Sequence, residues 1–219
     1  MALLAEFALF AALLFVSAET LLWPAGWVFL AIFFGGSVAI VLLLERDNPE
    51  LLAERVSSTV QRGQPLRDKV FLAVMSLLFL TWLILMPLGV MRFGWSEIPS
   101  WLQLLGALGL VLSFYVVFLT FRENAYRAPV VKVQEERGQS VVTTGPYQYV
   151  RHPMYSSMVL FFPASALLLG SWWGLVFSLV LLNLLVWRAA LEDRMLMNEL
   201  AGYREYTQSV RYRLIPRVW

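Results

Sequence analysis

Apolar residues gather in six stretches along the chain, separated by polar or charged segments. The stretches run over residues 2–18, 27–44, 70–90, 101–121, 155–169 and 172–190. Each is close to the length that a helix needs to cross the hydrocarbon core of a bilayer, about 30 Å thick. None alternates polar and apolar residues as a barrel strand does. The pattern therefore predicts an all-α integral membrane protein with about six transmembrane helices.

Three of these stretches, the first and the last two, need a separate interpretation. Stretch 2–18 has no Lys or Arg before it and no clear small-residue cleavage site after it, so we expect a retained helix and not a signal peptide. Only Gly170 and Ser171 separate the last two stretches, which predicts a tight helical hairpin over residues 155–190. Pro163 is a candidate kink in its first arm.

The basic residues fall almost entirely on alternate connecting segments. Segments 45–69 and 122–152 carry five each, the end from Arg188 onward carries six, and segment 91–100 carries one, Arg92. The positive-inside rule assigns the basic segments and both termini to the cytosol. We expect a prokaryotic inner membrane, or an endoplasmic-reticulum-type membrane in a eukaryote.

The composition narrows the function classes. Hydrophobic residues make up 59% of the 219 residues and charged residues 15%, and the net charge is +2. Nucleic-acid binding is not expected at this charge. The chain has no cysteine, which excludes disulfides, zinc–thiolate sites and a cysteine nucleophile. Its single histidine, His152, excludes metal enzymes built on histidine clusters, so no metal site is expected.

The two halves of the chain differ in chemistry. Residues 1–121 predict a four-helix membrane scaffold with a cytosolic amphipathic segment over 45–69. Its spans have almost no charged residue, which argues against a transporter. Residues 122–219 contain the polar segments and predict a cytosolic cofactor-binding region with the hairpin at its centre.

The topology gathers one polar set at the cytosolic end of the hairpin. It comprises Tyr147, Arg151, His152, Tyr155, Arg188, Glu192 and Asp193. Taken singly, His152 could be structural, and Arg188 and Glu192 could form an ordinary i, i+4 salt bridge. Together they suit a zwitterionic, partly cationic ligand with a sulfonium that rests against aromatic faces. S-adenosylmethionine is such a ligand, although the composition only permits it.

Three ordered motifs carry a family resemblance. They are Gly145-Pro-Tyr-Gln-Tyr-Val-Arg-His-Pro-Met-Tyr155, Arg188-Ala-Ala-Leu-Glu-Asp193, and Tyr203-Arg-Glu-Tyr206 followed by Arg213-Leu-Ile-Pro216. In this order they resemble the isoprenylcysteine carboxyl methyltransferase family, which is related to the phospholipid N-methyltransferases. The resemblance covers residues 130–216. It implies a membrane helical bundle that binds S-adenosylmethionine from the cytosol, while a lipophilic acceptor enters from the bilayer.

The resemblance also implies roles for individual residues. The cofactor residues are Gln134, Val141, Val142, Gly145, Tyr147, His152, Pro153, Met154, Tyr155, Glu192 and Asp193. Arg188 and Arg151 are the implied acceptor-binding residues, and Arg188 and Glu192 the implied catalytic ones. Ser157, where the family often has glycine, and Asp193, where it often has glutamate, are mild departures.

The sequence does not identify the methyl acceptor, which is a prenylcysteine-type carboxylate, a lipid amine or a small thiol. A carboxylate needs only positioning, for which Arg188 suffices. An amine has to lose a proton, and Glu192 or His152 is then the candidate base.

Two other interpretations of the function remain. A sterol-reductase-type NADPH enzyme shares an Arg-His-Pro-x-Tyr segment, usually with Asn in place of Met154. A non-catalytic membrane scaffold predicts that His152, Arg188 and Glu192 tolerate substitution.

Overall fold

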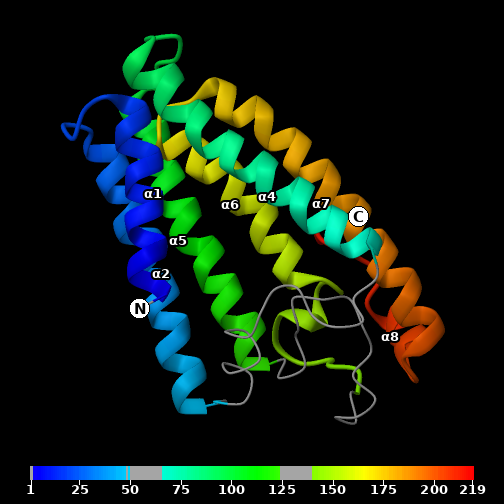
Figure 1. Cartoon of the computed structure of the whole chain (residues 1–219). Coiled ribbons are helices and arrows are strands. Elements are labelled where there is room, and N and C mark those ends of the chain that lie inside the picture. The colour runs from blue at the N-terminus through cyan, green and yellow to red at the C-terminus, as the bar shows by residue number, and fades with distance from the viewer. Residues whose placement is uncertain (1, 48, 50–65, 124–139) are drawn as a thin grey trace. The chain divides into compact units, whose positions relative to one another are not determined.

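The computed structural model describes residues 2–47, 49, 66–123 and 140–219 (Figure 1). Its α-helices are α1 (Ala2–Ala18), α2 (Pro24–Asp47), α4 (Leu66–Pro87), α5 (Ser100–Glu123), α6 (Pro153–Leu168), α7 (Trp172–Glu199) and α8 (Tyr203–Ser209). A turn of π-helix covers Leu88–Arg92, and a turn of 3₁₀-helix covers Gly145–Gln148. Within these ranges there is no strand, which confirms the all-α prediction.

Four of the described helices are long and apolar enough to cross a membrane. They cover Pro24–Arg46, Leu66–Arg92, Ser100–Glu123 and Trp172–Glu199. Helices α1 and α6 are apolar but shorter. The structure thus supports four of the six predicted crossings, and the full count and the cytosolic position of the termini stay predictions. The predicted amphipathic segment lies largely outside the described residues.

Two helices extend beyond the apolar stretches that predicted them. Helix α4 begins at Leu66, before the stretch that starts at Val70, and so includes Asp68. Helix α7 continues to Glu199, beyond Ala190. Since an α-helix satisfies its own backbone hydrogen bonds, it can continue from lipid into a polar environment without a break. Arg188, Glu192 and Asp193 consequently lie on one continuous helix.

The residues divide into two compact units. Unit 1 comprises Met1–Ala39, Val74–Phe114 and Met158–Asn183, and unit 2 comprises Ile40–Ala73, Tyr115–Ser157 and Leu184–Trp219. The predicted functional division between residues 121 and 122 is a different one, and it stays a prediction.

Aromatic packing and close helix contacts hold unit 1. The Phe33 ring lies between 5.0 and 6.0 Å from the rings of Phe10, Phe29, Phe34, Phe114 and Phe161. A Cβ atom at Gly106 would stand 2.4 Å from the backbone nitrogen of Leu168, so only glycine allows α5 and α6 this approach. Small residues commonly allow this kind of close approach between membrane helices.

Unit 2 surrounds the start of α6 with polar segments. Its apolar core includes Leu200, Tyr203, Tyr206 and Val210, with Val141 packed against them. Segment 140–157 and residues 210–215, which follow α8, both belong to this unit. Every predicted site residue that the structure describes therefore lies in unit 2.

Candidate functional site

The turn before α6 depends on a glycine. Gly145 has φ +57°, a left-handed conformation that other residues rarely adopt. A Cβ at this position would also stand 2.4 Å from Cγ of Glu123. The Thr144 hydroxyl donates a hydrogen bond of 2.7 Å to Glu123. The geometry therefore supports a turn-forming role for Gly145, which the resemblance places among the cofactor residues.

The residues after this turn lead into α6. The helix begins at Pro153, whose missing N–H would have no helical partner at this position. Tyr147 is 5% exposed, and its carbonyl oxygen accepts a 2.6 Å hydrogen bond from the Tyr206 hydroxyl. Between the 3₁₀ turn and α6, Arg151 and His152 are both buried.

Asp193 is the acceptor at the centre of a buried polar network. Its side chain is 0% exposed. Arg151 donates to both of its oxygens, at 2.8 and 2.9 Å. Arg213 donates to Oδ2 at 2.9 Å, and the Tyr203 hydroxyl to Oδ1 at 3.0 Å. His152 Nε2 lies 3.2 Å from Oδ1. A buried carboxylate is stable only with such partners, so this network organises unit 2.

For Arg151 and Asp193, these contacts favour roles that differ from the ones the resemblance implies. The Arg151 guanidinium also donates to the carbonyl oxygens of Val210 and Arg211, both at 2.9 Å. Its hydrogen bonds thus go to the protein itself, which favours a structural role over acceptor binding. Asp193 likewise accepts its hydrogen bonds from protein groups, those of Arg151, Arg213 and Tyr203, which favours a structural role for it as well.

Glu192 differs from its neighbour Asp193. Its Oε2 accepts a 2.8 Å hydrogen bond from the Tyr155 hydroxyl. Its Oε1 lies 3.9 Å from His152 Nδ1, and the Glu192 side chain is 17% exposed. The His152 and Tyr155 rings are 5.9 Å apart. The structure therefore brings together a carboxylate, an imidazole and a phenol that the sequence assigns to one site.

Arg188 forms an ion pair that the sequence analysis missed. Its Nη1 donates to Oδ1 of Asp68 in α4 at 2.7 Å, and both residues are buried. Its guanidinium carbon lies 4.7 Å from the centre of the Phe71 ring, a cation–π contact. The i, i+4 salt bridge with Glu192 is not formed. Among the described residues, Asp68 is the hydrogen-bond partner of the Arg188 guanidinium.

Two tyrosines of α8, Tyr203 and Tyr206, donate hydrogen bonds to residues of this part of unit 2. Burial raises the pKa of the Tyr203 hydroxyl far above its usual range, and the negative charge of Asp193 adds to this shift. Burial likewise raises the pKa of Tyr206, with a further contribution from Tyr147. Both hydroxyls therefore stay protonated at physiological pH and serve as hydrogen-bond donors.

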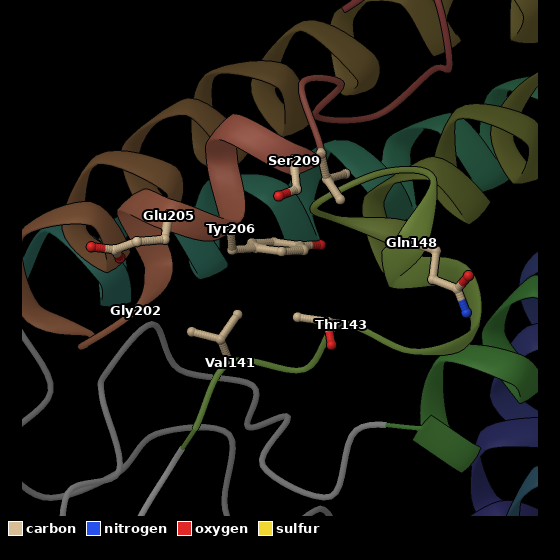
Figure 2. Close-up of a pocket in the computed structure, with 8 residues that line it drawn as sticks. Val141, Thr143, Gln148, Gly202, Glu205, Tyr206 and Ser209 are labelled. Atoms are coloured by element: carbon tan, nitrogen blue, oxygen red, sulfur yellow. The ribbon is translucent and has the colours of Figure 1, made fainter.

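A cavity of about 520 Å³ opens between α8 and the segment that precedes the 3₁₀ turn (Figure 2). It is lined by Val141, Thr143, Gln148, Gly202, Glu205, Tyr206, Ser209 and Val210. The volume lies within the range of small-molecule sites. In Figure 2 the Tyr206 ring lies along this space, with Val141 and Thr143 on the other side. Val141, a predicted cofactor residue, therefore does line a cavity.

The remaining site residues divide into described and undescribed ones. Val142, Met154 and Tyr155 are half-buried, and Pro153 is buried. Gln134 lies outside the described residues. Sequence reasoning assigned no role to Asp68, Glu123 or Arg213. Only Arg213 carried a signal, because it belongs to one of the quoted motifs. Asp68 is flanked by two basic residues at the edge of an apolar stretch, which resembles any membrane-flanking segment.

Comparison with known proteins supports the interpretation of the C-terminal half. The sequence model of the phospholipid methyltransferase family matches residues 101–201. The matched segment contains α5, α6 and α7, and with them His152, Arg188 and Glu192. The comparison with curated proteins found no match.

Proposed function

We propose that the protein transfers a methyl group from S-adenosylmethionine to a lipophilic acceptor at the cytosolic membrane face. The match of residues 101–201 to the phospholipid methyltransferase family, a family of integral membrane methyltransferases, supports this proposal. The acceptor enters from the bilayer and carries a carboxylate, an amine or a thiol. The family match favours methyl transfer over a nicotinamide reductase or a non-catalytic scaffold.

The arrangement of Glu192, His152 and Tyr155 carries this proposal. S-adenosylmethionine has an ammonium group, which a carboxylate binds, and a sulfonium, which aromatic faces accommodate. Glu192 is partly accessible and has Tyr155 at 2.8 Å, so a carboxylate and an aromatic ring adjoin each other. The donor and acceptor types of these residues fit the cofactor. The cavity beside Val141 and Tyr206 is a candidate place for its apolar part.

Methyl transfer requires little covalent participation from the protein. The cofactor supplies an activated methyl group on sulfur. The residues have to bind both reactants, align the acceptor and exclude water. We assign Glu192 to the cofactor and Arg188 to the acceptor, since the other donors of the Arg188 guanidinium have no protein partner within the described residues. For an amine acceptor, Glu192 or His152 takes up the proton.

Because Asp68 pairs with Arg188, the acceptor side of the proposed site includes a residue from the first 121 positions. The predicted scaffold would then contribute directly to the acceptor side, because Asp68 and Phe71 both contact the guanidinium of Arg188.

Calorimetric titration of the detergent-purified protein tests the cofactor. We expect S-adenosylmethionine and S-adenosylhomocysteine to bind and NADPH to release no heat. Glu192→Ala should abolish cofactor binding. Arg188→Ala should retain it and lose methyl transfer to an aminophospholipid or an S-prenylated cysteine in mixed micelles. Glu199→Ala is the matched control, because Glu199 is an exposed carboxylate on the same helix.

The outcomes separate the alternatives. Heat with NADPH alone would favour the reductase. Full activity in both the Glu192 and the Arg188 variant would show that the site assignment is wrong.

The proposal also includes the orientation in the membrane, with both termini in the cytosol. Because the chain has no cysteine, single cysteines can report it without background. Ser209→Cys, on the exposed side of α8, should react with an impermeant maleimide from the cytosolic side only. Trp95→Cys, in the segment with one basic residue, should react from the opposite side only.

A further inference from the structure

Residues 210–214 run beside the entry to α6 and bond to it through backbone groups. The Arg151 N–H donates to the Tyr212 carbonyl oxygen and the His152 N–H to the Arg213 carbonyl oxygen, both at 2.9 Å. One turn later, the Ser156 hydroxyl donates to the Leu214 carbonyl oxygen at 2.6 Å. These bonds join a segment after α8 to the residues that begin α6, about 60 positions earlier. The position of His152 therefore depends on residues that follow α8.

Arg213 reaches His152 by two routes. Its carbonyl oxygen accepts from the His152 backbone N–H, as described above. Its side chain donates to Oδ2 of Asp193 at 2.9 Å, while Oδ1 of the same carboxylate lies 3.2 Å from His152 Nε2. The Arg213 guanidinium also packs 4.9 Å from the Trp219 ring. The guanidinium thus restrains the carboxylate of Asp193 at the oxygen that His152 does not contact.

This contact has a chemical consequence for the imidazole ring. An ionised carboxylate only accepts hydrogen bonds, so the Nε2 atom that faces Asp193 has to carry its hydrogen. In the neutral ring, Nδ1 is then the atom with the lone pair, and it faces Glu192 Oε1 at 3.9 Å. Two acceptors at this separation can bind the same donor group of a ligand, since a nitrogen about 2.8 Å from each fits between them. The orientation of the His152 ring, and with it the position of Nδ1 opposite Glu192 Oε1, depends on the position of the Asp193 carboxylate.

We propose that Arg213 is a positioning residue of the site and that it acts through Asp193 to hold His152 with hydrogen on Nε2 and with Nδ1 directed toward the ligand. Arg151 donates to both oxygens of Asp193 from the segment before α6, and Arg213 adds a donor to Oδ2 from the segment after α8. The effect on cofactor affinity rests on the proposed function. The effect on the imidazole does not.

The single histidine makes the test direct. Protein labelled with ¹⁵N-histidine in detergent gives the ring signals of His152 alone, and these distinguish the two neutral tautomers from each other and from the imidazolium. We expect the wild type to show hydrogen on Nε2. Arg213→Gln should shift or broaden the ring signals and weaken S-adenosylmethionine binding about tenfold. Arg213→Lys, which keeps a cationic donor, should restore most of both.

Arg211→Gln is the matched control. It removes the same charge two residues away, from an exposed side chain whose backbone oxygen still accepts from Arg151. We expect wild-type histidine signals and cofactor affinity. The Arg213 side chain is 30% exposed, so its replacement is expected to leave a folded protein. Should Arg213→Gln not fold, Arg213→Lys is compared with wild type by the same two measurements.

The outcomes separate this proposal from the proposed function. Unchanged histidine signals in Arg213→Gln would overturn the positioning role, whatever happens to cofactor binding. Equal changes in Arg211→Gln would also overturn it, since they would reflect charge alone. Altered signals in Arg213→Gln, with no binding of S-adenosylmethionine to any variant, would support the positioning role and overturn the proposed function.

Discussion

The two compact units of the chain are held by different kinds of interaction. Unit 1 packs aromatic rings and small residues, and its described ion pair, Arg92 with Glu19, lies at the surface. Unit 2 contains buried ion pairs, those of Asp193 and Asp68. Buried charges cost free energy unless every partner is present, so unit 2 depends on a few specific contacts. Unit 1 spreads its stability over many weaker ones. The candidate site lies in the unit that is easiest to disrupt by a single substitution.

The sharpest test of this difference is Asp193→Ala. It leaves Arg151 and Arg213 without their shared carboxylate in a buried environment, and we expect a loss of about 3–5 kcal/mol in the free energy of unfolding. Thermal unfolding in detergent measures it. Glu199→Ala, on the same helix but exposed, should change the unfolding temperature little. Equal effects of the two substitutions would contradict the central role of Asp193.

Asp68→Leu should have the next largest effect, a loss of about 3 kcal/mol, because it removes the carboxylate that pairs with the buried Arg188 guanidinium. The double variant Asp68→Leu/Arg188→Met removes both charges and should cost less than the sum of the two single variants. A double-variant cycle of unfolding free energies measures this coupling. Additive effects would mean that the pair does not interact in the folded protein.

A substitution in unit 1 should act through packing and leave the site intact. Gly106→Ala places a methyl group against the backbone of α6, and we expect a loss of about 1–3 kcal/mol. Cofactor affinity per folded molecule should be unchanged. Gly35→Ala is the matched control, because a Cβ at Gly35 meets nothing within 4 Å. If both glycine variants unfold alike, the close approach of α5 and α6 is not a source of stability.

The smallest effect concerns alkaline pH. The folded pKa of Tyr203 is raised, so the folded state retains a proton that the unfolded chain loses above pH 10. Stability from this residue is therefore complete below pH 10 and decreases as the pH rises further. Between pH 9 and pH 10.5 the wild type should lose up to about 1 kcal/mol more than Tyr203→Phe. Parallel losses in the two proteins would show that Tyr203 does not retain its proton.

The helices of this protein could be predicted because a long apolar run in a membrane protein has few alternatives. Their ends could not. Asp68 and the residues after Ala190 look like loop residues in the hydropathy pattern, yet both continue a helix. The ion pair between Asp68 and Arg188 spans 120 positions. Nothing in the spacing of charged residues selects this pair over the i, i+4 pair of Arg188 with Glu192.

In the candidate site, too, the sequence does not show which partner each charged residue takes, even for two neighbouring residues. Glu192 and Asp193 are neighbours with the same charge, and the sequence assigned both to the cofactor. Successive residues of a helix point about 100° apart, so one carboxylate meets Arg151 and Arg213 in the interior while the other meets Tyr155. The two residues have distinct contacts because of this rotation, and Arg213 contacts Asp193 from the segment after α8.

The membrane class, the helical architecture and the set of residues at the entry to α6 could be read from the chain alone, since apolar length and ordered motifs are local properties. The folded structure was needed to identify which charges pair, which carboxylate is enclosed and which nitrogen of His152 faces Glu192. These outcomes depend on burial and on contacts between segments far apart in the chain. A buried charge takes the partner that the fold places within hydrogen-bond distance, and no local pattern records that distance.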